Sequence, residues 1–347
     1  MYMQNSEKQS NEKKILAIIP ARSGSKSVKN KNIQLIGGKP MLAYSIEHAK
    51  ESRLINRIIV TTDSKEYAKI AREYGAEVPF IRPAELATDT ALDIDVFRHA
   101  LMWLKDNEGY EPDIIVHLRP TGPFRNPAEI DRMIEIMLGD ETIDAVRSVK
   151  ENEVVPHKMW YLKEDGTIEP ILKDIPEAYN MPRQQLPKTY YQNGNTDLLR
   201  PSTIFQYNSM TGKNIKGYVM EEMYDVDSPA DFERVSNFMQ IKEGGKQFVF
   251  DIDGVIALKR EDLDYGQALP NEKMIAIVNQ LYDMGNRIVL FTARGYVTGI
   301  DWEQITKQQM RDWGVKYHEL KMGKPNADFY IDDRSLDMKF LYREFGK

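Results

Sequence analysis

The strongest constraint on the fold is a repeated alternation of short apolar segments with amphipathic ones. In the first half of the chain, runs with strand character are separated by stretches of helical periodicity; examples of such runs are ILAIIPA (15–21), RIIVTTD (57–63) and DIIVHL (113–118). This alternation is typical of an α/β fold with a mainly parallel sheet covered by helices on both faces. Ligands in such folds bind beyond the carboxyl ends of the strands, so we expect functional side chains at that edge.

The alternation occurs twice, on either side of a polar segment with two adjacent glycines. A length of 347 residues favours two domains. The segment KEGGKQ follows a helical pattern, and a new strand begins after it. We therefore expect a disordered tail at 1–13, a first domain at 14–241, a linker at 242–247 and a second domain at 248–347. The pattern loosens between 152 and 212, which indicates either an excursion with substrate contacts or a long surface hairpin.

The composition excludes several classes of function. A net charge of −6 argues against a protein that coats nucleic acid. The absence of cysteine excludes disulfides, cysteine-ligated zinc and thiol catalysis. The first thirteen residues have no apolar signal core, and no apolar run approaches the roughly 18 residues needed to span a bilayer. We expect a cytoplasmic protein that binds small molecules and has no nucleic-acid or membrane partner.

A cluster of cations follows the first predicted strand. The segment ARSGSKSVKNKNI carries Arg22, Lys26, Lys29 and Lys31 among small polar residues. Small residues let backbone N–H groups approach phosphate oxygens, while arginine and lysine supply positive charge. The segment lacks the Walker A and GxGxxG patterns. The residues alone therefore leave two alternatives, a phosphate site and a solvated basic loop.

Four segments in this order resemble the acylneuraminate cytidylyltransferases, the CMP-sialic acid synthetases and their relatives. They are IIPARSGSKSVKNKNI, LRPTGPFRNPAEID, RQQLPKTYYQNG and YDVDSPADF, within roughly residues 14 to 240. The resemblance implies a Rossmann-like nucleotidyltransferase domain that uses CTP and Mg²⁺. Such a domain transfers CMP to a sugar hydroxyl and releases pyrophosphate. It also implies a homodimer or higher homo-oligomer, in which the excursion reaches toward the partner's site.

The resemblance assigns roles to residues by their positions in these segments. The residues expected to face the nucleotide phosphates are Arg22, Ser25, Lys26, Lys31 and Asn32, of which Arg22 and Lys31 are also expected to be catalytic. The residues expected at the acceptor are Arg119, Thr121, Arg183, Gln184, Asn193 and Asp197. Asp225 and Asp227 are the expected Mg²⁺ ligands. In an extended segment, the side chains of residues i and i+2 point to the same side, so both carboxylates could bind one metal ion.

The chain departs from this family's usual pattern at several positions. Ser27 and Lys29 stand where relatives usually have glycine and proline, and Arg119 stands where glutamine is common. Asp197 and Arg200 follow the Asn-Gly pair. An extra cation near the acceptor would suit a further acid group or a phosphate. The acceptor is therefore a nonulosonic acid, an octulosonate-like acid, or a phosphorylated compound that gives a CDP-linked product; a non-enzymatic nucleotide sensor is another alternative.

Acidic residues follow the apolar strand that begins the second domain, FVFDIDG. Two acids at the end of a buried strand need a balancing cation. Asp251 could act as a nucleophile, and Asp253 as the acid and then the base. Thr292 and Lys324 would hold phosphoryl oxygens. The acids available to bind Mg²⁺ are Asp251, Asp253, Asp332 and Asp333, the last two at the end of a third predicted strand, DFYIDD.

These pieces, in this order over about residues 246 to 347, resemble the haloacid dehalogenase (HAD) phosphatase superfamily. The resemblance implies a small Rossmann-like domain, and the short distance between the first two motifs leaves no room for a large cap. The combined interpretation is a bifunctional enzyme, in which the second domain is a Mg²⁺-dependent phosphatase acting on a precursor of the acceptor. The alternative is a degenerate domain that serves as an oligomerisation scaffold.

The five histidines show no metal-ligand spacing. His117 lies in a predicted strand, and we expect it to be a core or loop-positioning residue rather than a catalyst. His48 and His99 lie on amphipathic helices, where a structural role is expected.

Overall fold

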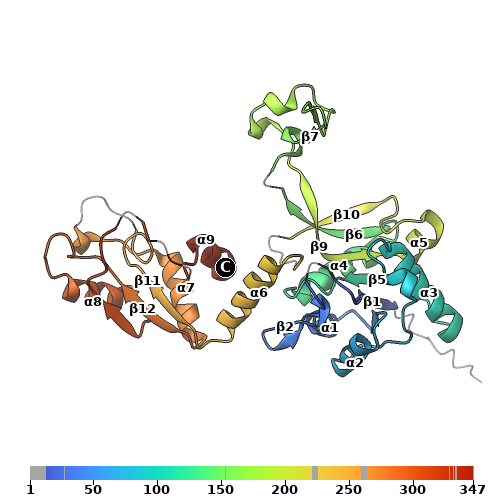
Figure 1. Cartoon of the computed structure of the whole chain (residues 1–347), viewed down its shortest axis with the longest axis horizontal. Helices are drawn as coiled ribbons and strands as arrows, with labels where there is room; N and C mark the ends of the chain where they lie inside the picture. The colour runs from blue at the N-terminus through green and yellow to red at the C-terminus, as the bar shows by residue number, and fades with distance from the viewer. Residues whose placement is uncertain are drawn as a thin grey trace, which may run out of the picture. The chain divides into compact units, whose positions relative to one another are not determined.

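The computed structural model describes residues 13–346 except 27, 153, 221–225, 259–263, 328, 331 and 333. The chain forms two compact units, residues 1–233 and 234–347 (Figure 1). The boundary lies inside helix α6 (Pro229–Lys242), upstream of the linker expected at 242–247. Among the described residues, no helix is long and apolar enough to cross a bilayer.

The first unit is built on a six-stranded sheet with the order β10-β6-β9-β5-β1-β4. The strands are β1 (Ile15–Pro20), β4 (Arg57–Thr61), β5 (Ile114–Leu118), β6 (Ala145–Glu151), β9 (Tyr190–Leu199) and β10 (Ile215–Val219). β1 pairs in parallel with β4 and β5, and β10 pairs in parallel with β6. β9 is antiparallel to both of its neighbours. The predicted α/β class with a mainly parallel sheet is confirmed for this unit, and the antiparallel β9 was not predicted.

Helices connect the strands of the first unit. They are α1 (Met41–Glu51), α2 (Lys65–Glu73), α3 (Asp93–Glu108), α4 (Pro127–Gly139) and α5 (Pro201–Tyr207). The Ser64 side chain accepts the Tyr67 N–H and caps α2, and Asn126 accepts the Ala128 N–H at the start of α4. Such caps satisfy N–H groups that the first turn of a helix leaves unpaired.

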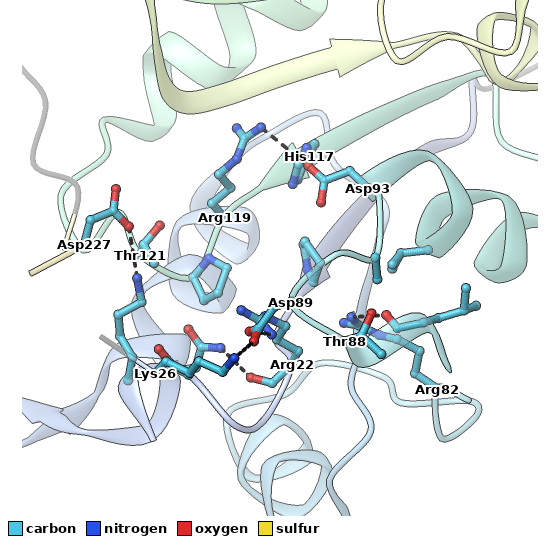
Figure 2. A pocket seen from close by; sticks show the side chains of 18 residues that line it. Arg22, Lys26, Arg82, Thr88, Asp89, Asp93, His117, Arg119, Thr121 and Asp227 are labelled. Atoms are coloured by element: carbon cyan, nitrogen blue, oxygen red, sulfur yellow. Dashed lines mark hydrogen bonds and ion pairs between the residues drawn. The ribbon is translucent and has the colours of Figure 1, made fainter. Parts of the chain in front are cut away.

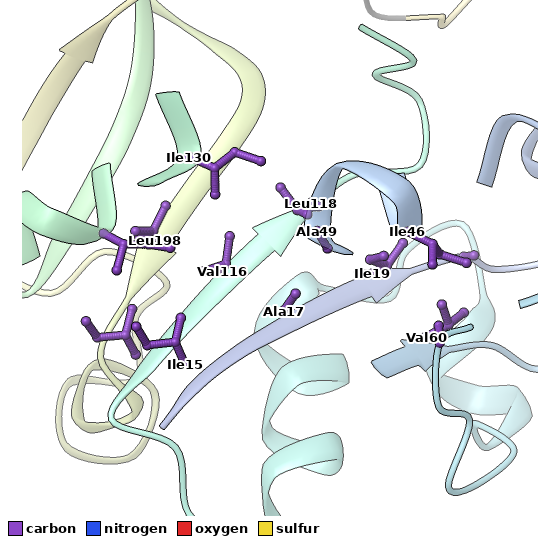
Figure 3. Close-up of a cluster of buried hydrophobic side chains, with 14 of the residues drawn as sticks. Ile15, Ala17, Ile19, Ile46, Ala49, Val60, Val116, Leu118, Ile130 and Leu198 are labelled. Atoms are coloured by element: carbon purple, nitrogen blue, oxygen red, sulfur yellow. The ribbon is translucent and has the colours of Figure 1, made fainter. Parts of the chain in front are cut away.

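Alternate residues of β1 belong to two different apolar clusters. Ile15, Ala17 and Ile19 pack in one cluster with side chains of α1 and α4 (Figure 3). Leu16 and Ile18 pack in the other, with side chains of α3. Successive strand residues point to opposite faces of the sheet, so this alternation shows that the sheet has a core on each face.

The loosened segment contains a small antiparallel hairpin that connects β6 to β9. It consists of β7 (Trp160–Leu162) and β8 (Ile168–Pro170), followed by single-turn helices that include η5 (Arg183–Gln185). The hairpin projects away from the main sheet (Figure 1). The segment at 21–33, which carries the predicted cluster of cations, is called the cationic loop below. A second two-stranded element follows it, made of β2 (Leu35–Ile36) and β3 (Lys39–Pro40).

Helix α6 begins with a side-chain cap. The Ser228 hydroxyl accepts the Asp231 N–H at 3.2 Å, and the Asp231 carboxylate accepts the Ser228 N–H at 3.0 Å. This reciprocal pair is a capping box, which explains why the chain turns into a helix directly after Asp227.

The second unit contains a three-stranded parallel sheet with the order β11-β12-β13. Its elements are β11 (Gln247–Phe250), β12 (Arg287–Phe291), β13 (Glu319–Lys321), α7 (Glu272–Asp283), α8 (Glu303–Asp312) and α9 (Met338–Phe345). The third strand is therefore at 319–321, and the prediction of a strand at DFYIDD is wrong for the residues of that segment that the structure describes. Phe329 is 85% exposed and Tyr330 is 53% exposed, so neither of these described residues packs in a sheet.

Candidate active site

A pocket of about 600 Å³ lies in the first unit, beyond the carboxyl ends of β1 and β5 (Figure 2). Its walls are the loop after β1, the loop at 82–93 that leads into α3, the end of β5, and Asp227. Eight predicted site residues line it: Arg22, Ser25, Lys26, Lys31, Asn32, Arg119, Thr121 and Asp227. The pocket therefore brings together all five residues expected at the nucleotide and one expected Mg²⁺ ligand.

Carboxylates of the same pocket balance its cations. Arg22 donates to Asp89 at 2.7 Å, and Lys26 also pairs with Asp89. Lys31 Nζ lies 3.0 Å from the Asp227 carboxylate. Hydrogen bonds from Lys26 and Arg22 lower the pKa of Asp89, which is therefore ionised at neutral pH. A polyphosphate entering the pocket could replace these carboxylates as the partner of the cations.

Hydrogen bonds with Asp63 and with Asn32 hold the cationic loop in place. Asp63, which follows β4, accepts the Ser23 N–H at 2.8 Å and also the Ser23 hydroxyl. Burial opposes ionisation of Asp63, but the hydrogen bonds from Ser23 outweigh it, so the pKa of Asp63 lies below its usual value. Asn32 donates to the Arg22 carbonyl at 3.0 Å. The sequence interpretation missed Asp63, although its place after a strand that neighbours β1 was a usable signal.

Arg82 is a second residue that the sequence interpretation missed. It lines the pocket, yet it is buried, and its Nε donates to the Thr61 hydroxyl at 3.1 Å. Burial lowers the pKa of Arg82 to about 10, so it stays charged at neutral pH. Arg82 therefore fixes the loop at 82–93 to the end of β4, and this loop carries Asp89 and Asp93.

Two residues expected at the acceptor lie behind the pocket wall instead of lining it. Asp197 is buried and accepts from Arg119 at 2.9 Å, from Gln192 at 3.1 Å and from Arg147 at 3.5 Å. Asn193 is buried as well and accepts the Ser148 hydroxyl at 2.6 Å. Both residues thus position side chains and strands rather than border the cavity.

Arg200 does not add a cation to the pocket, which corrects the sequence expectation. β9 runs antiparallel to β5, so its carboxyl end lies at the opposite edge of the sheet from the pocket. Arg200 follows this end and donates to the carbonyl of Met137, in the last turn of α4, at 2.7 Å, and to that of Ile143, in the segment between α4 and β6, at 2.9 Å.

The remaining predicted residues of the first unit lie elsewhere. Arg183 and Gln184 belong to η5 in the excursion and do not line the pocket of this chain. Asp225 and Ser27 lie outside the described residues.

In the described part of the chain, no group of three or more acidic, histidine or cysteine side chains could hold a metal. Mg²⁺ at a nucleotide is usually bound by one or two carboxylates together with phosphate oxygens, and Asp227 at the pocket fits that arrangement.

The second unit has a charged cluster after β11. Lys324 Nζ lies 2.5 Å from the Asp251 carboxylate. Arg294 donates to both carboxylate oxygens of Asp253, at 2.9 Å from Nε and 2.8 Å from Nη2. The Arg294 side chain is fully buried and also donates to Gln309 at 2.6 Å. Arg294 therefore holds Asp253, whose side chain is 29% exposed, beside Asp251. The sequence signal for this pair was the arginine that ends FTAR.

Other predicted residues of this cluster are only partly accounted for. Thr292 is buried at the end of β12, and its hydroxyl accepts the Arg294 N–H at 3.2 Å. The Asp332 carboxylate accepts the Arg334 N–H at 2.8 Å, and Asp333 lies outside the described residues. Among the residues that the structure describes, the predicted acids are not assembled into a metal-binding group of three.

The chain belongs to the cytidylyltransferase family, whose model matches residues 16–242. This match ends at the last residue of α6, so it covers the sheet of the first unit and not that of the second.

Individual relatives agree with this assignment. The chain is 36% identical to the post-translational flagellin modification protein B of Campylobacter coli, over 66% of this chain and 96% of that protein. It is 34% identical to an N-acylneuraminate cytidylyltransferase of Escherichia coli, over 72% of this chain and 58% of that protein. It is 31% identical to a CMP-N,N′-diacetyllegionaminic acid synthase of Legionella pneumophila, over 66% of this chain and 98% of that protein.

A solved structure supports the fold. The structure of CMP:2-keto-3-deoxy-manno-octonic acid synthetase complexed with CTP matches with a TM-score of 0.51 and 18% sequence identity, over 65% of this chain and 98% of that chain.

Proposed function

We propose that the first unit transfers CMP from CTP to a hydroxyl group of an acidic sugar and releases pyrophosphate. Membership of the cytidylyltransferase family supports the nucleotide, and the names of the relatives support an acidic sugar as acceptor. The observation that carries the proposal is the pocket in which Arg22, Lys26 and Lys31 meet at the carboxyl edge of the sheet. Their carboxylate partners are exchangeable for phosphate oxygens.

Positioning and charge neutralisation account for the chemistry. The triphosphate displaces Asp89 from Arg22 and Lys26, and these cations then stabilise the charge that develops on the departing pyrophosphate. The anchors from Asp63 and Asn32 hold the loop in place before the substrate binds, so little reorganisation is needed during the reaction. Mg²⁺, held by Asp227 and by Asp225 according to motif position, would neutralise further phosphate charge.

The structure disfavours the rival in which the acceptor is phosphorylated and the product is CDP-linked. Arg119 was the reason to consider it. The Arg119 guanidinium is already balanced by Asp197 at 2.9 Å and lies 3.8 Å from Asp93. Unlike the partly exposed Asp89, Asp197 is buried and is also held by Gln192 and Arg147, so a phosphoryl group at this wall could not displace it from Arg119 at little cost.

Product analysis tests the transfer proposal. The full chain is incubated with CTP, Mg²⁺ and a panel of acidic sugars, and the products are weighed by mass spectrometry. The expected product is a sugar that carries one phosphate, formed with one equivalent of pyrophosphate. A product with two phosphates would favour the rival, and CTP binding without pyrophosphate release from any acceptor would favour the sensor.

We further propose that the second unit hydrolyses a phosphomonoester, such as a phosphorylated precursor of the acceptor sugar. The observation that favours it is Asp251 at the end of β11, paired with Lys324 and next to Asp253. The Asp251 carboxylate would attack phosphorus, and the ester oxygen would leave with a proton from Asp253. Water, deprotonated by Asp253, would then release phosphate from Asp251. Because both Asp253 oxygens accept from Arg294, proton delivery requires one of these hydrogen bonds to loosen.

The Mg²⁺ that supports such chemistry would be held by Asp251 together with Asp332 or with Asp333, which lies outside the described residues. Replacing Asp251 with asparagine separates this proposal from the scaffold alternative. We expect Asp251→Asn to lose phosphatase turnover while the oligomeric mass measured by light scattering stays that of the wild type. A wild-type protein that hydrolyses no phosphomonoester would contradict the proposal.

A further inference from the structure

The turn at 119–122, which follows β5, connects the pocket wall to the segment of Asp227. Three of its four residues, among them Thr121, line the pocket. The Thr121 carbonyl accepts the N–H of Val226 at 3.1 Å. Val226 is fully buried and directly precedes Asp227, and Figure 2 shows Thr121 and Asp227 beside each other. The turn therefore holds the backbone that carries Asp227 to the pocket.

Arg125 fixes this turn from the side away from the pocket. Its buried guanidinium donates to the carbonyls of both ends of the turn, from Nη2 to Arg119 at 2.5 Å and from Nη1 to Gly122 at 2.5 Å. Nη1 also donates to the Ser45 hydroxyl on α1 at 2.9 Å, and Nε donates to the Asn195 carbonyl on β9 at 2.8 Å. The planar guanidinium thus ties the turn to a helix and to a strand of the sheet.

Gly122 shows how closely the guanidinium packs on the turn. A Cβ atom at this position would lie 2.7 Å from Nη2 of Arg125. The φ of Gly122 is not in the left-handed region, so the close approach of Arg125, and not the backbone conformation, requires glycine here. Since hydrogen bonds to both ends of the turn hold the guanidinium, a side chain at 122 has to displace it from these partners.

Asp227 depends on its backbone for its position. Its side chain is exposed, so packing does not fix it. Lys31 pairs with this carboxylate at 3.0 Å, but in the proposed reaction Lys31 faces the phosphates of the nucleotide. Groups behind a metal ligand set its orientation, and their loss typically weakens metal binding by about 10–100-fold.

We propose that Arg125 is a positioning residue of the metal site: by fixing the turn at 119–122 it sets, through Thr121 and Val226, the place where Asp227 meets Mg²⁺ at the nucleotide. Arg125 does not line the pocket, so it acts only through the turn. The inference rests on the proposed CMP transfer, in which Asp227 is a ligand of Mg²⁺.

Three variants separate this role from a general contribution to stability. Arg125→Lys keeps the positive charge but loses the fork that bridges the two carbonyls. Gly122→Ala displaces the guanidinium from the other side and leaves Arg125 in the chain. Arg200→Lys is the matched control, because Arg200 also holds a backbone carbonyl, that of Met137, and does not line the pocket.

Calorimetry of the full chain with CTP, without an acceptor, provides the measurement. The ratio of the Kd for CTP without Mg²⁺ to that with saturating Mg²⁺ reports the coupling between metal and nucleotide. We expect the wild type to bind CTP more tightly with Mg²⁺, and Arg125→Lys and Gly122→Ala to bring this ratio close to one. The Kd for CTP without Mg²⁺ should change by less than about threefold in both variants, since the phosphate cations stay in place.

The control variant should keep the wild-type ratio, and thermal unfolding shows that each variant is folded. The inference is overturned if Arg125→Lys and Gly122→Ala keep the wild-type ratio, or if they weaken CTP binding equally with and without Mg²⁺, which a purely structural role would do. It is also overturned by a wild-type ratio of one, or by an equal loss of the ratio in Arg200→Lys.

Failure of the transfer proposal is a separate result. A wild-type protein that releases no pyrophosphate with any acidic sugar contradicts CMP transfer. The calorimetry needs no acceptor, so in that case it still decides whether Arg125 sets the affinity for Mg²⁺ at the bound nucleotide.

Discussion

The two charged sites of this chain balance their charges in opposite ways. In the pocket of the first unit, the cations belong to a loop and their carboxylate partners are exposed: the side chain of Asp89 is 38% exposed, and that of Asp227 is 73% exposed. In the second unit, the cation Arg294 is fully buried against Asp253. Exposed ion pairs contribute about 0–1 kcal/mol each, whereas breaking a buried pair leaves an unpaired charge and costs about 3–5 kcal/mol.

This difference indicates which charged side chains can exchange an ion-pair partner for a substrate group. The cations of the first unit can exchange a carboxylate for a phosphate at little cost. The Asp253–Arg294 pair of the second unit exchanges partners only at a higher cost, because Arg294 is fully buried, and Asp251 with Lys324 is the pair at which we propose that a substrate binds.

The largest expected effect separates the two sites by activity. Asp251→Asn should lower phosphomonoester hydrolysis by about a thousandfold or more, because it removes the proposed nucleophile. Pyrophosphate release from CTP should stay at the wild-type rate. Asp283→Asn is the matched control, since Asp283 is an exposed acid of α7 that pairs with Lys316. Equal phosphatase rates in both variants would contradict the assignment of Asp251.

A cation of the first unit should matter only where it lines the pocket. Lys31→Met should lower kcat/KM for CTP by about two to three orders of magnitude, because it removes a charge that faces the phosphates. Lys29→Met removes a charge from the same loop, but Lys29 does not line the pocket. The kcat/KM of this variant for CTP should therefore stay close to that of the wild type. Similar losses in the two variants would mean that the loop acts through its overall charge.

Stability measurements test whether the buried pair is fixed. Asp253→Ala leaves the Arg294 charge buried and unpaired, so we expect the second unit to lose about 3 kcal/mol of its free energy of unfolding. Asp89→Ala breaks partly exposed pairs and should change the stability of the first unit by less than about 1 kcal/mol. Hydrogen exchange of amides in β12 and in β1 measures the two units separately. Equal effects of the two variants would remove the distinction between the sites.

The smallest expected effect concerns the exchange of partners itself. Asp89→Asn removes the anion that competes with the triphosphate for Arg22 and Lys26, so CTP should bind about two- to fivefold more tightly. Calorimetry without Mg²⁺ measures this change. Weaker binding would show that Asp89 contacts the nucleotide directly.

Local sequence patterns were sufficient to predict much of the first unit. Long apolar runs such as that of β1 and capped amphipathic helices such as α2 are encoded in neighbouring residues. β9 carries the polar run Gln-Asn-Gly-Asn-Thr-Asp in its interior, and β13 is the short segment Glu-Leu-Lys, so neither has a clear strand pattern. Their places are set by pairing with distant strands.

The same distinction applies to the sites. Residues directly after parallel strands, such as Arg22 and Asp251, were predicted because the ends of those strands share one edge of the sheet. Arg200 was misplaced because the direction of β9 is not readable from its own residues. Asp89 and Arg82 were missed because they lie in a loop, where common residue types show no periodicity.

The most direct test of the account is a single reaction, in which the full chain is mixed with CTP, Mg²⁺ and an N-acylated acidic sugar and the products are weighed. The account predicts a CMP-linked sugar with one phosphate and one equivalent of pyrophosphate, formed by the wild type and by Asp251→Asn but not at a comparable rate by Lys31→Met. Formation of a CDP-linked product, or release of no pyrophosphate with any acidic sugar, would contradict it.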